Sequence, residues 1–301
     1  MRLLDKDLQR ELLKVFHYFD FFRHALSEEE VWKYLGVRVH EQAFKINLEH
    51  LVKVDEITYQ NGYYALRNSS DIISERISNV ALNKKRLNQA KLISKLLGNI
   101  PFVKGVGISG SLSKNGSKPD SDIDFFLITG KNKVWTVKAV AILLKRLLFF
   151  GSHKYLCVNY LLAEDNLALK KKNQFQAIEA ITLMPVYGSD VFEQFYTENK
   201  WISEYYPNKF PPSFRHASNQ NNWLKSLIQR VLKSEIGEKL ELMAMKAFKK
   251  HGELKYGNNK ESSVSYKRNE SVYFPNDFEA VVLRNYEKKV SGIFRQHIQA
   301  K

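Results

Sequence analysis

The chain has 301 residues, of which 44% are hydrophobic and 26% are charged. This composition predicts a folded globular protein with room for two or three domains, and it excludes a wholly disordered chain. The net charge of +15 points to an anionic partner, which nucleic acid, a nucleotide or an acidic surface would each supply. The excess is marked from residue 201 onward, where 18 Lys and Arg face 10 Asp and Glu.

The start of the chain and its most apolar stretch bear on location. The first residues are too charged for a secretory signal, and the apolar run 134–150 is interrupted by Lys138, Lys145 and Arg146. We therefore expect a cytoplasmic protein with no membrane partner. The single cysteine, Cys157, falls in a predicted buried strand and is expected to be a core residue.

Residues 1–68 predict a small N-terminal domain of three helices and a hairpin. Residues 4–19 and 41–52 repeat apolar side chains at helical spacing, and Ser27 to Glu30 form a capping box before the helix between them. Asn61-Gly62 lies between two short β-rich runs, which is a strong hairpin signal. This order of elements is that of a winged-helix domain.

Winged helices that read DNA place their third helix against phosphates in the major groove. Here that helix carries Glu41 and Glu49 against Lys45, so its outer face is nearly neutral. We therefore favour a structural or protein-contact role for this domain over sequence-specific DNA binding.

Residues 69–98 predict a linking element, with one long basic helix over 71–97 that Gly98-Asn99 terminates. We expect its charged side chains to face solvent. The alternative is that one of its lysines contacts a bound phosphate. Residues 99–165 then predict a compact core with strands at 103–108 and 123–129, a helix at 135–149 and a strand at 155–162.

Two aspartates at the start of the second core strand suggest a metal site. Side chains alternate along a strand, so Asp122 and Asp124 point to one face while Ile123 points to the other. Adjacent carboxylates repel each other unless a cation lies between them, and such oxygen ligands suit Mg²⁺ or Mn²⁺.

The turn between the two strands supplies groups for an anion. Gly110 lets the backbone approach a phosphate closely, and Ser111 offers an amide and a hydroxyl donor. Ser109, Ser113 and Lys114 are also expected to contact phosphate. Together with the aspartates, the turn predicts a site for a metal and a triphosphate.

Gly110-Ser111 followed after ten residues by Asp122-Ile-Asp124 resembles the signature of the polymerase β-like nucleotidyltransferase superfamily. Four further segments resemble bacterial nucleotidyltransferase-domain proteins with an N-terminal winged helix: residues 156–162, 164–167, 177–188 and 273–278. The resemblance implies an α+β protein with a small N-terminal domain, a nucleotidyltransferase core with a small mixed sheet and a helical C-terminal region. It also implies transfer of a nucleoside monophosphate from a nucleoside triphosphate to a hydroxyl on an unidentified acceptor, which is nucleic acid, protein or a small molecule.

The family's complete site has a third carboxylate on a neighbouring strand, and here that strand offers Asn159 instead. An asparagine supplies a metal with one neutral oxygen, so nucleotide binding is expected to survive better than transfer. Glu164 or Asp165 at the end of the strand, or Glu179 on the next helix, are alternative carboxylates. Asn159 is either a metal or nucleotide contact or a hydrogen-bonded core residue, and Glu179 is either a site residue or part of a salt bridge.

The rest of the chain predicts helices. Residues 166–215 form a helical extension of the core, with Pro185 breaking the helical run 174–206. Residues 216–222 are the best linker candidate, and 223–301 form a basic C-terminal region with helices at 223–251 and 278–298 and a loop over 252–271.

Three hypotheses for function follow from these patterns. The first is a metal-dependent nucleotidyltransferase, monomeric or oligomeric. The second is a regulatory or interaction module that keeps the nucleotide pocket without turnover. The third and weakest is a sequence-specific transcription factor.

Overall fold

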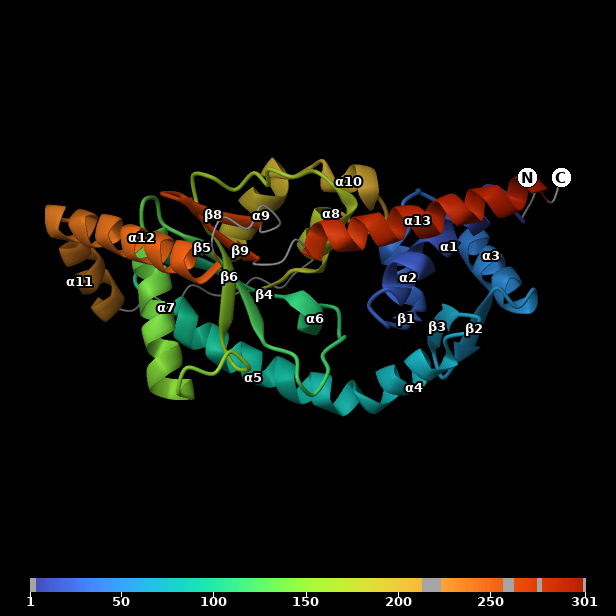
Figure 1. Ribbon diagram of the computed structural model, residues 1–301, viewed down its shortest axis with the longest axis horizontal. Coiled ribbons are helices and arrows are strands. Elements are labelled where there is room, and N and C mark those ends of the chain that lie inside the picture. The colour runs from blue at the N-terminus through green and yellow to red at the C-terminus, as the bar shows by residue number, and fades with distance from the viewer. Residues whose placement is uncertain (1–3, 213–222, 257–262, 275–277, 300–301) are drawn as a thin grey trace.

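A computed structural model describes residues 4–212, 223–256, 263–274 and 278–299 as a mixed α+β protein (Figure 1). At the N-terminus, three helices and a three-stranded antiparallel sheet of order β1-β3-β2 form a unit over residues 4–66, hereafter the N-terminal unit. Its elements are α1 (Lys6–Asp20), β1 (Leu26–Ser27), α2 (Glu28–Tyr34), α3 (Glu41–Lys53), β2 (Ile57–Gln60) and β3 (Tyr63–Leu66).

The predicted capping box and hairpin turn of the N-terminal unit are confirmed. Ser27 Oγ accepts from Glu30 N at 3.3 Å and Glu30 Oε2 accepts from Ser27 N at 2.9 Å, which completes the capping box of α2. Asn61 and Gly62 both have positive φ, as the tight turn of a right-twisted hairpin requires. Strand β1 was not predicted, because two residues give no readable alternation.

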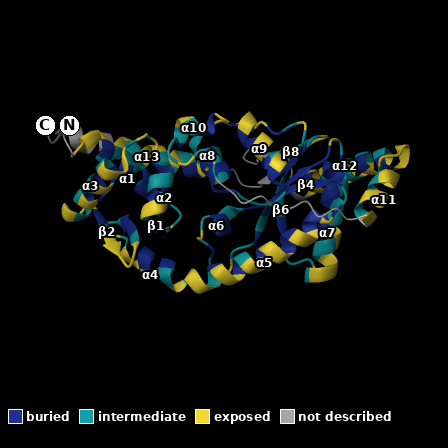
Figure 2. Cartoon of the chain, turned by 180° about the vertical axis from the view of Figure 1, so that it is seen from behind, coloured by how far each residue is buried: buried dark blue, intermediate teal, exposed yellow. Residues whose placement is uncertain are grey.

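The predicted linking helix is interrupted. It consists of α4 (Ser70–Ser78) and α5 (Val80–Gly98), with a break at Asn79, whose Nδ2 donates to the carbonyl of Glu75 at 2.9 Å. Short amide side chains compete with the backbone for helical carbonyls, which explains a break at this residue. The lysines of α5 are exposed as expected, and Figure 2 shows exposed residues along its outer side, but Arg76 and Arg86 are buried.

The second sheet has six strands in the order β7-β4-β5-β6-β9-β8, which confirms a mixed sheet. Only β5 and β6 pair in parallel. Its strands are β4 (Val103–Ser109), β5 (Asp124–Thr129), β6 (Cys157–Ala163), β7 (Met184–Tyr187), β8 (Ser263–Lys267) and β9 (Glu270–Phe274).

The sheet is larger than the sequence predicts, because three strands come from segments expected to be helix or loop. Residues 184–187 were assigned to a helical run and form the edge strand β7, where Pro185 is tolerated because an edge strand need not donate every amide. The predicted loop 252–271 contains β8, which pairs with β9 through the two-residue turn Arg268-Asn269.

Helices cover both faces of this sheet. They are α6 (Gly110–Ser113), α7 (Val134–Phe149), α8 (Gln174–Thr182), α9 (Ser189–Glu198), α10 (Ile202–Tyr205), α11 (Trp223–Leu232), α12 (Glu235–Tyr256) and α13 (Phe278–Gln299). One face packs on α5, α7 and α12, and the other packs on α8 and α9. The predicted helix 223–251 is divided between α11 and α12, whereas the linker candidate 216–222 and residues 275–277 of the resemblance lie outside the described residues.

The N-terminal unit is joined to the rest of the chain by packing. One apolar cluster runs from α1, α2 and α3 into the α8 and α9 face of the sheet. Helix α13 lies along α1 and α8 (Figure 1), where the Tyr18 and Tyr286 rings are 5.6 Å apart and Lys289 Nζ is 2.6 Å from Asp20 Oδ2. Within the described residues no helix is long and apolar enough to cross a membrane.

Candidate functional site

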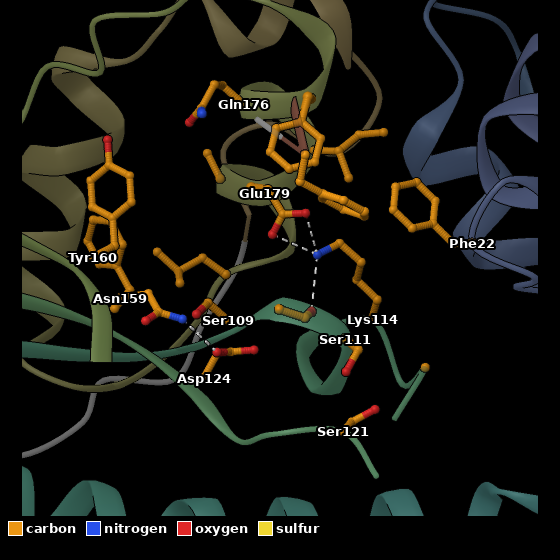
Figure 3. Close-up of a pocket in the computed structure, with 18 of the residues that line it drawn as sticks. Phe22, Ser109, Ser111, Lys114, Ser121, Asp124, Asn159, Tyr160, Gln176 and Glu179 are labelled. Atoms are coloured by element: carbon orange, nitrogen blue, oxygen red, sulfur yellow. Dashed lines mark hydrogen bonds and ion pairs between the residues drawn. The ribbon is translucent and has the colours of Figure 1, made fainter. Parts of the chain in front are cut away.

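A cavity of about 510 Å³ opens between the N-terminal unit and the six-stranded sheet. Its polar end is formed where β4, β5 and β6 carry Ser109, Asp124 and Asn159, and Figure 3 shows these side chains close to one another. Gly110, Ser111 and Asp122 also line it. Four of the five predicted phosphate contacts, all except Ser113, therefore line the same cavity as both predicted metal ligands.

The Gly-Ser turn and the aspartates meet because β4 and β5 are antiparallel partners, with Ser109 opposite Asp124. Gly110 has φ +66°, and a Cβ on this residue would lie 2.3 Å from Asp124 Oδ2. Both the backbone conformation and the space therefore require glycine at this position. The close approach brings the turn and the Asp124 carboxylate together.

Burial and the neighbouring Asp122 carboxylate, with a smaller effect from Glu179, raise the pKa of Asp124 to about 6. Asp122 lies two residues before the first residue of β5, and Ile123 and Phe125 are buried, as the alternation predicts. An acid pair that disfavours its own ionised state gains by binding a divalent cation. The donors present, two carboxylates beside serine hydroxyls, suit Mg²⁺ or Mn²⁺.

Asn159 occupies a bulge in β6. Val158 pairs with Phe125 and Tyr160 pairs with Phe126, so Asn159 is the extra residue between them. Bulges redirect a side chain, and here Asn159 Nδ2 donates to Asp124 Oδ1 at 3.2 Å. The amide nitrogen, and not the oxygen expected as a metal ligand, faces the carboxylate, so Asn159 orients Asp124.

Lys114 and Glu179 form an ion pair across the cavity. Lys114 Nζ is 2.9 Å from both Glu179 oxygens and donates to the Gly110 carbonyl at 3.1 Å, and Figure 3 shows the pair above the turn. Glu179 thus lines the cavity and also forms the salt bridge that was its alternative role. Glu164 and Asp165 instead face Lys104 and Lys131, at 3.6 Å each, and do not line the cavity.

Ser113 also departs from expectation. Its buried hydroxyl donates to the Gly110 carbonyl at 2.9 Å, and it lines a second, smaller cavity instead. Its contribution is therefore to the shape of the turn, since a hydroxyl that is turned toward Gly110 is turned away from a phosphate in the larger cavity.

The loop that carries Asp122 is anchored to α5. Buried Arg86 donates to the carbonyls of Pro119, at 2.7 Å, and Ser121, and Asn83 Oδ1 accepts from Ser117 N at 3.0 Å. Asn83 and Arg86 occupy the same helical face as Ala90, Ile93 and Leu97. That spacing is a signal in the sequence that could have placed them inward.

A second arginine fixes the other side of the turn. Arg76 donates to the carbonyls of Lys114 and Asn115, at 3.0 and 2.7 Å, and pairs with Glu30 of α2 at 2.8 Å. His24 lies against the same guanidinium, and burial together with this charge lowers its pKa well below the ordinary value. The segment that follows the Gly110 turn is thereby held against the N-terminal unit.

The far end of the cavity consists of side chains that the sequence did not single out. Phe19 and Phe22 come from the N-terminal unit, Phe175 from α8 and Phe278 from α13. No spacing in the sequence could have shown that residues so far apart share one cavity.

Comparisons with protein-family models, known proteins and solved structures find no match to this chain. In the described part of the chain, no group of three or more His, Cys, Asp or Glu side chains is arranged to hold a metal ion. The nucleotidyltransferase resemblance therefore depends on the motif and on the geometry around it.

Proposed function

We propose that this protein transfers a nucleoside monophosphate from a nucleoside triphosphate to a hydroxyl acceptor, and that it uses Mg²⁺ or Mn²⁺. The observation that carries the proposal is the contact between the Gly110 turn and Asp124, with Asp122 beside it in the same cavity. The small mixed sheet supports a polymerase β-like core. The order of helices and strands in the N-terminal unit supports a winged-helix domain.

The chain's own groups divide into two sets. Ser109 and Ser111 line the cavity at the turn and would donate hydrogen bonds to triphosphate oxygens, while Asp122 and Asp124 would hold the cation. When bound, the cation would neutralise phosphate charge and polarise the reacting phosphoryl group. Asn159 keeps the Asp124 carboxylate in place through its amide.

In the transfer, the acceptor oxygen forms a bond to the α-phosphorus and the bond from that phosphorus to the bridging oxygen of pyrophosphate breaks. The acceptor's proton must leave. Glu179 is the remaining carboxylate among the described residues that line the cavity, so it is the candidate proton acceptor. Its pairing with Lys114 must then loosen, which leaves Lys114 available to the departing phosphates.

One observation favours the second candidate, a nucleotide-binding module with little turnover. Asn159 turns its amide nitrogen to Asp124, and Glu179 is paired with Lys114, so neither residue adds an unpaired third carboxylate to the acid pair. A cation held by two carboxylates binds a nucleotide more readily than it activates an acceptor. The N-terminal unit would then contact a partner protein, since on α3 Lys45 pairs with Glu41 at 2.7 Å and presents little free positive charge.

The test is transfer from α-labelled nucleoside triphosphates to pooled hydroxyl acceptors with Mn²⁺, with pyrophosphate release measured alongside. We expect activity in the wild type, none in Asp124→Ala, and full activity in Asp165→Ala, whose carboxylate lies outside the cavity. Nucleotide binding without pyrophosphate release would favour the module. A gain of turnover in Asn159→Asp would identify a weakened enzyme, and transfer that survives Asp124→Ala would refute the proposal.

A further inference from the structure

The cavity continues past the Lys114–Glu179 pair into a part walled by aromatic side chains, hereafter the aromatic wall. Its members come from three distant segments: Tyr18, Phe19, Phe22, Phe175 and Phe278. In Figure 3, Phe22 approaches from the N-terminal unit while Tyr160 lies on the opposite side of the cavity, beyond the ion pair. Any ligand with its phosphates at the Gly110 turn would extend toward one of these two sides.

The rings of the wall are held by each other. Tyr18 is 5.3 Å from Phe19 and 5.5 Å from Phe22 between ring centroids, and Phe22 is 6.0 Å from Phe278. These spacings are those of packed aromatic pairs, so the wall is formed before any ligand arrives. A preformed aromatic surface loses little conformational freedom on binding a flat ring.

Tyr18 also carries a polar group. Its side chain is 2% exposed, and its hydroxyl has no hydrogen-bond partner among the described residues. Burial raises the pKa of Tyr18 well above its ordinary value, so the phenol keeps its proton. A buried hydroxyl without a partner is costly, and this one is covered by protein atoms, so Tyr18 contributes its ring and not its hydroxyl to the surface that a ligand meets.

These features select among possible occupants. The cavity's volume lies in the range of small-ligand sites, and its aromatic end is continuous with the end that carries the serines and the acid pair. An aliphatic chain or an extended peptide offers no flat face to the aromatic rings. A nucleobase offers flat faces for stacking.

We propose that the aromatic wall is the nucleobase subsite, with the base stacked on Phe22. The inference rests on the proposed function, because it places the triphosphate at the Gly110 turn. A purine covers more of the wall than a pyrimidine and is therefore the expected base. The nucleotide would bridge the N-terminal unit and the sheet.

The test is calorimetric binding of ATP, GTP, CTP, UTP and inorganic triphosphate, each with Mn²⁺, to the full chain. We expect the purine nucleotides to bind more tightly than the pyrimidine nucleotides, and all four to bind more tightly than inorganic triphosphate. Phe22→Ala should weaken ATP binding about 5- to 100-fold, the range for loss of one base stack, and leave inorganic triphosphate unchanged.

Phe21→Ala is the matched control. Phe21 packs against Phe22 and Phe278, at 5.1 and 6.2 Å, but does not line the cavity. It should therefore lose stability comparable to Phe22→Ala while keeping ATP affinity. Tyr18→Phe keeps the ring and removes a covered hydroxyl, so it should leave the affinities of the four nucleotides unchanged.

The outcomes separate the two proposals. If inorganic triphosphate binds as tightly as ATP, or if Phe22→Ala and Phe21→Ala affect ATP equally, the subsite is wrong and the triphosphate site stands. The wall would then serve an apolar acceptor or packing alone. If neither ATP nor inorganic triphosphate binds the folded wild type, the proposed function fails and the subsite fails with it.

Discussion

Replacing Gly110 with alanine should damage the candidate site much more than an equivalent change elsewhere. Gly62 provides the comparison, because it also has positive φ, +85° against +66°, but nothing lies within 4 Å of the position its Cβ would take. Both variants force an L-residue into the left-handed region, which costs about 1 kcal/mol. Only Gly110→Ala also meets another side chain.

The additional cost at Gly110 follows from the distance of 2.3 Å between the added Cβ and Asp124 Oδ2, where ordinary contact begins at 3.4 Å. The two atoms must separate by about 1 Å, which turns the carboxylate and breaks the 3.2 Å bond from Asn159 Nδ2. A hydrogen bond to a charged group contributes about 1.5–3 kcal/mol. We therefore expect Gly110→Ala to lose about 2–4 kcal/mol of unfolding free energy and Gly62→Ala about 1 kcal/mol.

Urea denaturation of the two variants measures this difference, and Mn²⁺ titration of the folded proteins measures its effect on the acid pair. Gly62→Ala should bind Mn²⁺ like the wild type, whereas Gly110→Ala should bind at least tenfold more weakly because Asp124 has turned. Equal losses of stability in the two variants, with Mn²⁺ affinity unchanged in both, would show that the contact between the turn and Asp124 does not organise this site.

Two other predictions concern residues that hold the loops around the site in place, and a third concerns the packing of α12 on α7. The pKa of His24 is lowered by burial and by Arg76, so His24 is protonated at a higher pH in the unfolded chain than in the folded one. The free energy of unfolding should therefore fall as pH drops below about 6.5, by at most about 1.4 kcal/mol per pH unit. Urea denaturation between about pH 6.5 and 5 should show that the unfolding free energy of His24→Asn changes less with pH than that of the wild type. The same pH dependence in both proteins would contradict this. Arg86→Met leaves two carbonyls of the Asp122 loop without their donor, and urea denaturation should show a loss of about 2–4 kcal/mol of unfolding free energy. Lys85→Met, on the exposed side of α5, should lose about 0.5 kcal/mol or less. Glu241→Ala removes a fully buried carboxylate that accepts from Trp135 N at 2.8 Å and Thr136 N at 2.7 Å. Thermal melting should show a loss of about 2–4 kcal/mol of unfolding free energy, and Glu238→Ala, whose side chain is more exposed, is the control. Equal melting temperatures of the two variants would contradict the inferred anchoring of α12 on α7.

The parts of the structure that the sequence predicted well are those built from neighbouring residues. The capping box at Ser27, the Asn61-Gly62 turn and the end of α5 at Gly98 each depend on contacts within a few residues. The approach of Gly110 to Asp124 was also predictable, because a short loop joins two strands that pair with each other.

Predictions were wrong where a segment's state depends on a distant partner. Residues 184–187 are a strand because β4 offers them an edge, although Pro185 and the flanking helices suggest a break between helices. Residues 263–267 are a strand because their hairpin partner β9 pairs in turn with the distant strand β6, and the hairpin has no standard turn signal. Neither partner is visible in the local pattern.

The sequence by itself determined that two carboxylates and a Gly-Ser turn would share one end of a strand pair, since alternation and a short connection leave few alternatives. Tertiary structure alone decided the surroundings of that pair. It turned the Asn159 amide toward Asp124, paired Lys114 with Glu179, and brought Phe22 and Phe278 into one cavity. Such contacts depend on how helices pack across a sheet, and residues far apart in the chain carry no spacing that encodes them.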